Sequence, residues 1–240
     1  MQLEHEHTSE AIRVRLETEN HPNYLRDWVY GGIDGAITTF AVVAGVVGAG
    51  LSSKVILILG VANLLADGLS MAASNYSGTK TEVDELARYR EIEERHIDID
   101  PEGERREVRQ IMTLKGLAGP ALDDAVRAIT SDRQTWINTM LAEEYGLSIN
   151  LRSPLKSGVS TFVSFMLFGL IPLLPYMLGL AQAFEVALAT TFIAFFAIGS
   201  IKSRWALASW WRSGLETLLI GVAACSLAYG VGWLAERIIT

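Results

Sequence analysis

Five stretches of this chain are apolar and long enough to cross a bilayer, and no other feature restricts the fold as strongly. About 20 apolar residues span the hydrocarbon core as a helix. The stretches of this length lie approximately at residues 28–50, 55–76, 157–180, 183–201 and 214–234. The sequence therefore predicts an all-α membrane protein with five transmembrane helices.

A polar segment separates the second span from the third. Residues 77–152 hold 16 Asp and Glu against 11 Lys and Arg, so this segment contributes −5 of the net charge of −7. An acidic balance favours cations as partners and argues against nucleic acid. We therefore expect this insertion to attract metal cations.

The distribution of Lys and Arg predicts the orientation, because basic loops stay in the cytoplasm. Most of these residues precede the first span, lie in the insertion, or occupy the loop between the fourth and fifth spans. The N-terminus and the insertion should therefore be cytoplasmic. The expected organisation is a cytoplasmic segment with an interfacial helix (1–27), two spans (28–76), a helical metal-binding domain (77–153) and three spans (154–240).

The insertion is predicted to be helical throughout. The second span has no helix breaker after Gly78, so its helix should continue into water as far as Ile97. Asp100 followed by Pro101 is typical of a helix start. The helices expected after it lie at 101–117, at 120–130, and from a cap at Ser131 or Asp132 to about residue 146.

Two spans each carry one acid that we expect to be buried, Asp34 in the first and Asp67 in the second. An ionisable group at bilayer depth is costly and indicates a functional site. Asn63, Asp67 and Met71 follow at helical spacing and form one polar stripe. The structural alternative is a hydrogen-bonded contact between helices. That alternative is as probable as function for Asn63, and packing is the better explanation for Met71 alone, whereas for the two acids we favour an ion pathway.

Three predicted helices of the insertion each carry a pair of potential metal ligands on one face. These pairs are Glu93 with His96, Glu104 with Glu107, and Met140 with Glu144. Oxygen ligands with one imidazole and one thioether suit Fe²⁺ or Mn²⁺. Solvated helix faces with arginine partners are the alternative explanation. From the spacing alone, the two explanations are about equally good.

Other chemistry has little support in the sequence. The single cysteine, Cys225, excludes an intramolecular disulfide and a zinc site built from cysteines. The chain has no phosphate-binding glycine loop, nucleophile elbow or zincin motif. We therefore expect neither an organic cofactor nor ATP-driven pumping by this chain alone.

At this point the motifs resemble those of the vacuolar iron transporter family, from about residue 24 to residue 232. The matching segments are LRDWVYGGIDG at 25–35 and GVANLLADGLSM at 60–71. Two more lie in the insertion: Pro101-x-x-Glu104-x-x-Glu107-Val108 and Met140-x-x-x-Glu144-Tyr145-Gly146-Leu147. The resemblance implies a five-span homodimer, with the pathway between subunits, that moves Fe²⁺, and in some members Mn²⁺, out of the cytosol in exchange for protons.

The resemblance also implies roles for individual residues. Asp34 corresponds to the essential acid of the first span, and Met71 to a methionine of the pathway. The residues that correspond to ligands of the insertion are Glu93, Glu104, Glu107, Met140 and Glu144. Three positions depart from the family pattern. His96 replaces a glutamate, Leu141 stands where a second methionine can occur, and Asn63 replaces a glutamate for which Asp67, one turn later, can substitute.

The sequence thus predicts a non-enzymatic, proton-coupled exporter of Fe²⁺, or of Mn²⁺, in a vacuolar or bacterial inner membrane, delivering the ion to the vacuole or periplasm. One alternative is a membrane-anchored di-iron ferroxidase, since Glu93-x-x-His96 resembles half of such a centre. Oxygen consumption with Fe²⁺ would distinguish the oxidase from a carrier. A storage or sensor protein without flux is a further alternative, which uptake of iron into proteoliposomes would exclude.

Overall fold

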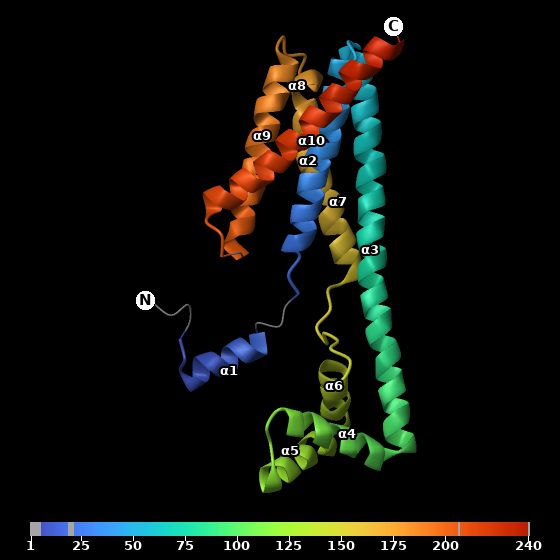
Figure 1. Ribbon diagram of the computed structural model, residues 1–240, viewed down its shortest axis with the longest axis vertical. Coiled ribbons are helices and arrows are strands. Elements are labelled where there is room, and N and C mark those ends of the chain that lie inside the picture. Colours follow the sequence, from blue (N-terminus) through green and yellow to red (C-terminus); the bar gives the residue numbers. More distant parts are fainter. Residues whose placement is uncertain (1–5, 19–21, 206, 240) are drawn as a thin grey trace. The chain divides into compact units, whose positions relative to one another are not determined.

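The computed structural model describes residues 6–18, 22–205 and 207–239, and these residues form helices and loops without strands (Figure 1). Five helical segments are long and apolar enough to cross a membrane. They are α2 (Leu25–Gly48), α3 (Ser53–Ile99), the run of α7, η1 and α8 (Pro154–Met177), α9 (Ala183–Lys202) and α10 (Trp210–Ile239). The prediction of an all-helical fold with five helical segments suited to crossing a membrane is confirmed for the described residues.

The contacts divide the chain into two compact units. Residues 23–77 and 154–240 form one unit, which holds the five apolar segments and is here called the membrane unit. Residues 78–153, here called the insertion, form most of the other unit, to which α1 (Ser9–Thr18) also belongs. The apolar N-terminal part of α3 lies in the membrane unit, and its polar C-terminal part lies in the insertion. The absence of a helix breaker after Gly78 predicted this continuous helix.

Helix α2 is the centre of the membrane unit, where it packs against α7, α9 and α10 (Figure 1). Two glycines allow the close approach of α7 (Pro154–Leu170). A methyl group on Gly31 would lie 2.3 Å from the carbonyl oxygen of Thr161, and one on Gly35 would lie 2.4 Å from that of Phe165. Small residues of this kind let membrane helices pack backbone to backbone. The neighbouring core consists of buried apolar side chains, including Phe40, Phe165 and Phe195.

The third span differs from the single helix that we expected at 157–180. Helix α7 ends at Leu170, a 3₁₀ turn η1 follows (Ile171–Leu173), and α8 is short (Leu174–Met177). Pro172 and Pro175 explain the break, because proline lacks the amide hydrogen that an α-helix needs.

Three further helices complete the insertion: α4 (Pro101–Leu114), α5 (Gly119–Ser131) and α6 (Arg133–Glu143). The predicted caps are present, since Asp100 accepts a hydrogen bond from the amide of Gly103 at 2.9 Å and Asp132 accepts one from that of Thr135 at 2.8 Å. The apolar faces of the helices meet in one core, which includes Val108, Met112, Trp136, Ile137 and Leu141.

Two helices of the insertion end earlier than expected. Helix α4 stops at Leu114 because the chain turns at Gly116, which has a φ of +93°. Helix α6 stops at Glu143, and Gly146, with a φ of +66°, reverses the chain. A positive φ is readily adopted only by glycine, which makes both residues typical helix stops.

The tight contact at Gly31 leads to a prediction about stability. Gly31→Ala should destabilise the membrane unit by about 1–3 kcal/mol, because the added methyl group meets backbone atoms that cannot move independently. Thermal unfolding of the purified protein in detergent measures the effect. Gly230→Ala is the matched control, because a methyl group there meets nothing within 4 Å. Equal stability of the two variants would contradict the packing described for α2 and α7.

Candidate functional site

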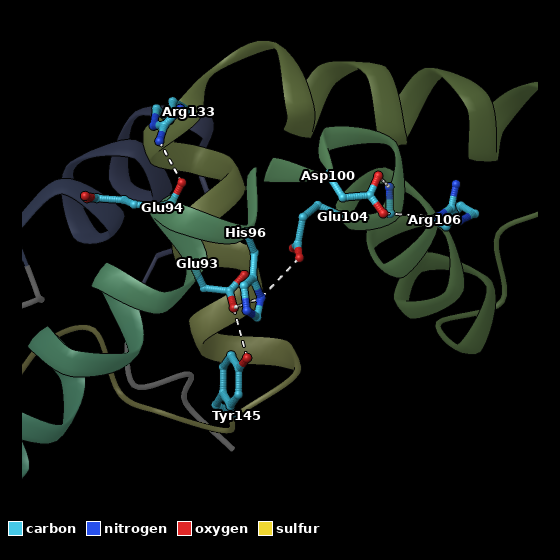
Figure 2. Close-up of polar contacts among 9 residues, drawn as sticks. Glu93, Glu94, His96, Asp100, Glu104, Arg106, Arg133 and Tyr145 are labelled. Atoms are coloured by element: carbon cyan, nitrogen blue, oxygen red, sulfur yellow. Dashed lines mark hydrogen bonds and ion pairs between the residues drawn. The ribbon is translucent and has the colours of Figure 1, made fainter. Parts of the chain in front are cut away.

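Polar side chains from three segments of the insertion converge (Figure 2). Glu93 and His96 lie on the last turns of α3, Glu104 lies on the first turn of α4, and Tyr145 follows α6. The Nδ1 atom of His96 is 3.4 Å from Oε1 of Glu104 and 3.9 Å from Oε1 of Glu93. The imidazole thus lies between two carboxylates from different helices, as the i,i+3 pairs in the sequence predicted.

The two carboxylates at the centre are buried. Glu93 has no exposed surface, and Glu104 retains 5% exposure. In each, the Oε2 atom has no hydrogen-bond partner. A buried carboxylate oxygen that lacks a partner is costly, and such groups are uncommon unless they have a role. His96 is about half exposed, so solvent reaches the cluster at this residue.

Several arginines of the insertion pair with acids other than Glu93 and Glu104. Arg105 pairs with Glu102, and Arg109 pairs with Asp123 at 2.7 Å. Arg106 and Arg133 likewise contact Asp100 and Asp98. Within the described residues, no arginine or lysine forms an ion pair with Glu93 or Glu104. The alternative of a solvated face with arginine partners therefore does not describe these two glutamates.

Burial, followed by repulsion among the carboxylates, determines the electrostatics of the cluster. Desolvation, together with repulsion from Glu93 and Glu107, raises the pKa of Glu104 to about 8. Desolvation and repulsion from Glu107 and Glu93 also raise the pKa of Glu144. Glu107 and Glu144 are more exposed than Glu93, yet they lie near enough to repel the buried pair. The cluster therefore holds protons when no other cation is available.

Met140 differs from the other predicted ligands in its surroundings. It is fully buried and belongs to the apolar core of the insertion.

Within the described residues, no three side chains of His, Cys, Asp or Glu already lie close enough together to enclose a metal ion. Binding of a cation would thus require the carboxylates to move together around it.

The membrane unit contains the four residues that we predicted for a pathway. The carboxylates of Asp34 on α2 and Asp67 on α3 interact electrostatically. Both are partly exposed in the single chain, although we expected buried acids. Met71 packs at the edge of the apolar core, and the side-chain nitrogen of Asn63 is buried without a hydrogen-bond partner.

The fully buried acid of the membrane unit is Asp27, which the sequence analysis did not single out. Its Oδ1 atom accepts a hydrogen bond of 2.8 Å from Asn75, which also donates to Thr161 Oγ1 at 2.7 Å. Asp27 precedes Gly31 by one turn and therefore lies on the face of α2 that approaches α7. The spacing of Asp27 and Gly31 in the sequence could therefore have indicated that Asp27 is buried. The network joins α2, α3 and α7 through polar contacts.

Comparison with known proteins gives consistent matches over most of the chain. A model described as the VIT family matches residues 25–233. A protein named vacuolar iron transporter 1 from Arabidopsis thaliana is 33% identical over 88% of this chain and 87% of its own length. Vacuolar iron transporters from Centaurea cyanus and Toxoplasma gondii are 34% and 32% identical, over 93% and 92% of this chain and over 94% and 78% of their own lengths.

The raised pKa of Glu104 predicts how pH changes the stability of the metal-free insertion. Between the ordinary value of 4.5 and about 8, folded Glu104 binds more protons than unfolded Glu104, so stability falls as pH rises through this range. Glu104→Gln should flatten the decline. Hydrogen exchange of the α4 and α6 amides, corrected for the intrinsic effect of pH, measures it.

The control for this prediction is Glu102→Gln, which changes an exposed acid of the same helix that pairs with Arg105. It should leave the pH dependence as it is in the unaltered protein. A decline that is equally steep in the Glu104→Gln variant would show that Glu104 is not the titrating group.

Proposed function

Because this chain belongs to the VIT family, we propose that it exports Fe²⁺, and also Mn²⁺, from the cytosol to the vacuole or periplasm in exchange for protons. The relatives named above as vacuolar iron transporters motivate iron as the substrate. The observation that carries the proposal is the pair of buried glutamates, Glu93 and Glu104, which lie on either side of His96 and form no ion pair with a lysine or arginine among the described residues.

The insertion collects the ion in this proposal. Its six ligands are Glu93, His96, Glu104, Glu107, Met140 and Glu144. A divalent cation relieves the repulsion among the carboxylates and provides a partner for the free oxygens of Glu93 and Glu104. The mixture of oxygen, imidazole and thioether ligands suits a first-row ion of intermediate softness.

Asp34, Asp67, Asn63 and Met71 form the pathway in the membrane unit. The electrostatic interaction of Asp34 with Asp67 supports a shared site, since two anionic groups together attract one dication better than either alone. The side-chain nitrogen of Asn63 has no hydrogen-bond partner, which supports the view that this part of the stripe on α3 does not serve to tie helices together. A stripe that only tied helices together would use this group.

The exposure of this stripe supports a homodimer. Most of the apolar part of α3 is not buried within a single chain, and Asp67 and Met71 on it are only half-buried. Lipid offers a carboxylate no partner, so a lipid-facing Asp67 would be costly. A second copy placed against α3 covers the stripe and brings a second set of acids to the same pathway.

Proton exchange follows from competition for the same oxygens. A carboxylate must lose its proton to bind a metal, so arrival of the ion releases protons. We assign the insertion and the N-terminus to the cytosolic side, because the basic residues gather on these segments. The acids of the membrane unit would then accept protons from the opposite compartment as they release the ion.

The pathway predicts a clear phenotype for Asp34→Asn. The variant should insert and fold normally but show only background uptake of Fe²⁺ into proteoliposomes, because the amide carries no charge to bind the dication. Asp124→Asn, on the exposed surface of the insertion, is the matched control and should transport normally. Full activity of Asp34→Asn would refute the assignment of the pathway.

The collecting role predicts a different effect for Glu93→Gln. The iron concentration that gives half-maximal uptake should rise by about tenfold, the scale expected for loss of a supporting group at a metal site. The maximal rate should change little, because the membrane pathway is intact. Glu94→Gln is the control, since Arg133 contacts Glu94 through its backbone oxygen. A lower maximal rate with unchanged half-saturation would argue against a collecting site.

A further inference from the structure

Tyr145 contacts the candidate metal site from outside the predicted ligand set (Figure 2). Its hydroxyl group donates a hydrogen bond of 2.9 Å to Oε1 of Glu93. Glu93 is fully buried, so this contact is not weakened by competition with bulk water. The hydroxyl group of Tyr145 thus engages Oε1 of Glu93, while the Oε2 atom has no hydrogen-bond partner.

The position of the Tyr145 ring is fixed on two sides. The ring packs on that of Tyr89 of α3, with 4.5 Å between ring centroids. On the other side, the turn at Gly146 holds the backbone, where the amide of Leu147 donates to the carbonyl of Leu141 at 2.9 Å. A side chain held in this way can keep a neighbouring carboxylate in one orientation.

A phenol suits this task because it is a neutral donor. A lysine or arginine at the same place would neutralise Glu93 and compete with an incoming cation. Tyr145 instead donates one hydrogen bond and leaves the negative charge of the carboxylate in place. A phenol ordinarily titrates near pH 10, so Tyr145 carries its proton at physiological pH and is a hydrogen-bond donor.

We propose that Tyr145 is a positioning residue for cation binding by the insertion, and that it acts by holding Oε1 of Glu93 so that Oε2 is free to bind a divalent metal ion. This inference rests on the proposed collecting role of the insertion. Groups that orient metal ligands through hydrogen bonds commonly contribute about 10–100-fold to metal affinity. The loss of a single hydroxyl group should therefore be measurable.

The test uses full-length protein in detergent and Co²⁺, a divalent ion that is stable in air. Tyr145→Phe keeps the aromatic ring and removes only the hydroxyl group. Calorimetric titration should show Co²⁺ binding weakened about tenfold. Tyr89→Phe is the matched control, because Tyr89 contributes its ring to the same stack, and it should bind Co²⁺ as the unaltered protein does.

Two further variants separate positioning from packing. In a Glu93→Ala background, Tyr145→Phe should have no additional effect on Co²⁺ affinity, since the residue through which Tyr145 acts is absent. An equal loss in both backgrounds, or unchanged binding by Tyr145→Phe alone, would overturn the inference. A phenolate-to-iron charge-transfer band with Fe³⁺ that disappears in Tyr145→Phe would also overturn it, because Tyr145 would then be a ligand.

Comparison of the unaltered protein with Glu104→Gln distinguishes the two proposals. If the unaltered protein binds no Co²⁺, or if Glu104→Gln binds it equally well, the collecting site itself fails, and the role of Tyr145 fails with it. If the unaltered protein binds Co²⁺ through Glu104 and the Tyr145→Phe variant binds equally well, only the inference about Tyr145 fails.

Discussion

The constraint on which the candidate sites depend is the burial of neighbouring carboxylates that repel each other and have no lysine or arginine partner among the described residues. In the insertion, Glu93 and Glu104 are buried close together while the arginines pair elsewhere. In the membrane unit, Asp34 and Asp67 repel each other. Only a proton or another cation relieves such repulsion. A site of this kind links proton binding to metal binding, because each occupies the oxygens that the other needs.

The same chain segment carries residues of both candidate sites. Helix α3 is continuous from Ser53 to Ile99 and bears Asp67 near its apolar end and Glu93 near its polar end. Its outer surface in the membrane unit remains uncovered in a single chain. The chain belongs to the VIT family, and the carboxylates on α3 are the residues on which we base the proposed passage of a divalent metal ion.

Local sequence signals predicted most of the fold. The apolar lengths located the five spans, Asp100 with Pro101 marked the start of α4, and Asp132 capped α6. The predicted helix boundaries were wrong where a proline or a glycine interrupts an otherwise helical segment. Two prolines broke the third span, and positive-φ glycines ended α4 and α6 early.

The site was predictable only in part. Spacing placed Glu93, His96 and Glu104 on suitable helix faces, and the structure brings them together. Spacing could not show the ion pairs that join different helices, such as Arg109 with Asp123 and Arg133 with Asp98. For the same reason it missed the hydrogen bond of Tyr145 with Glu93 and the burial of Asp27 against Asn75. Such contacts depend on tertiary packing, which a single sequence specifies only indirectly.

The most direct test of the central claim measures metal and proton flux together. Proteoliposomes with an entrapped pH indicator and an acidic lumen are given external Fe²⁺. The account predicts that Fe²⁺ accumulates inside while the lumen becomes more alkaline, and that removing the pH gradient slows the uptake. Uptake of Fe²⁺ that proceeds at the same rate without a gradient, and with no change in luminal pH, would contradict it.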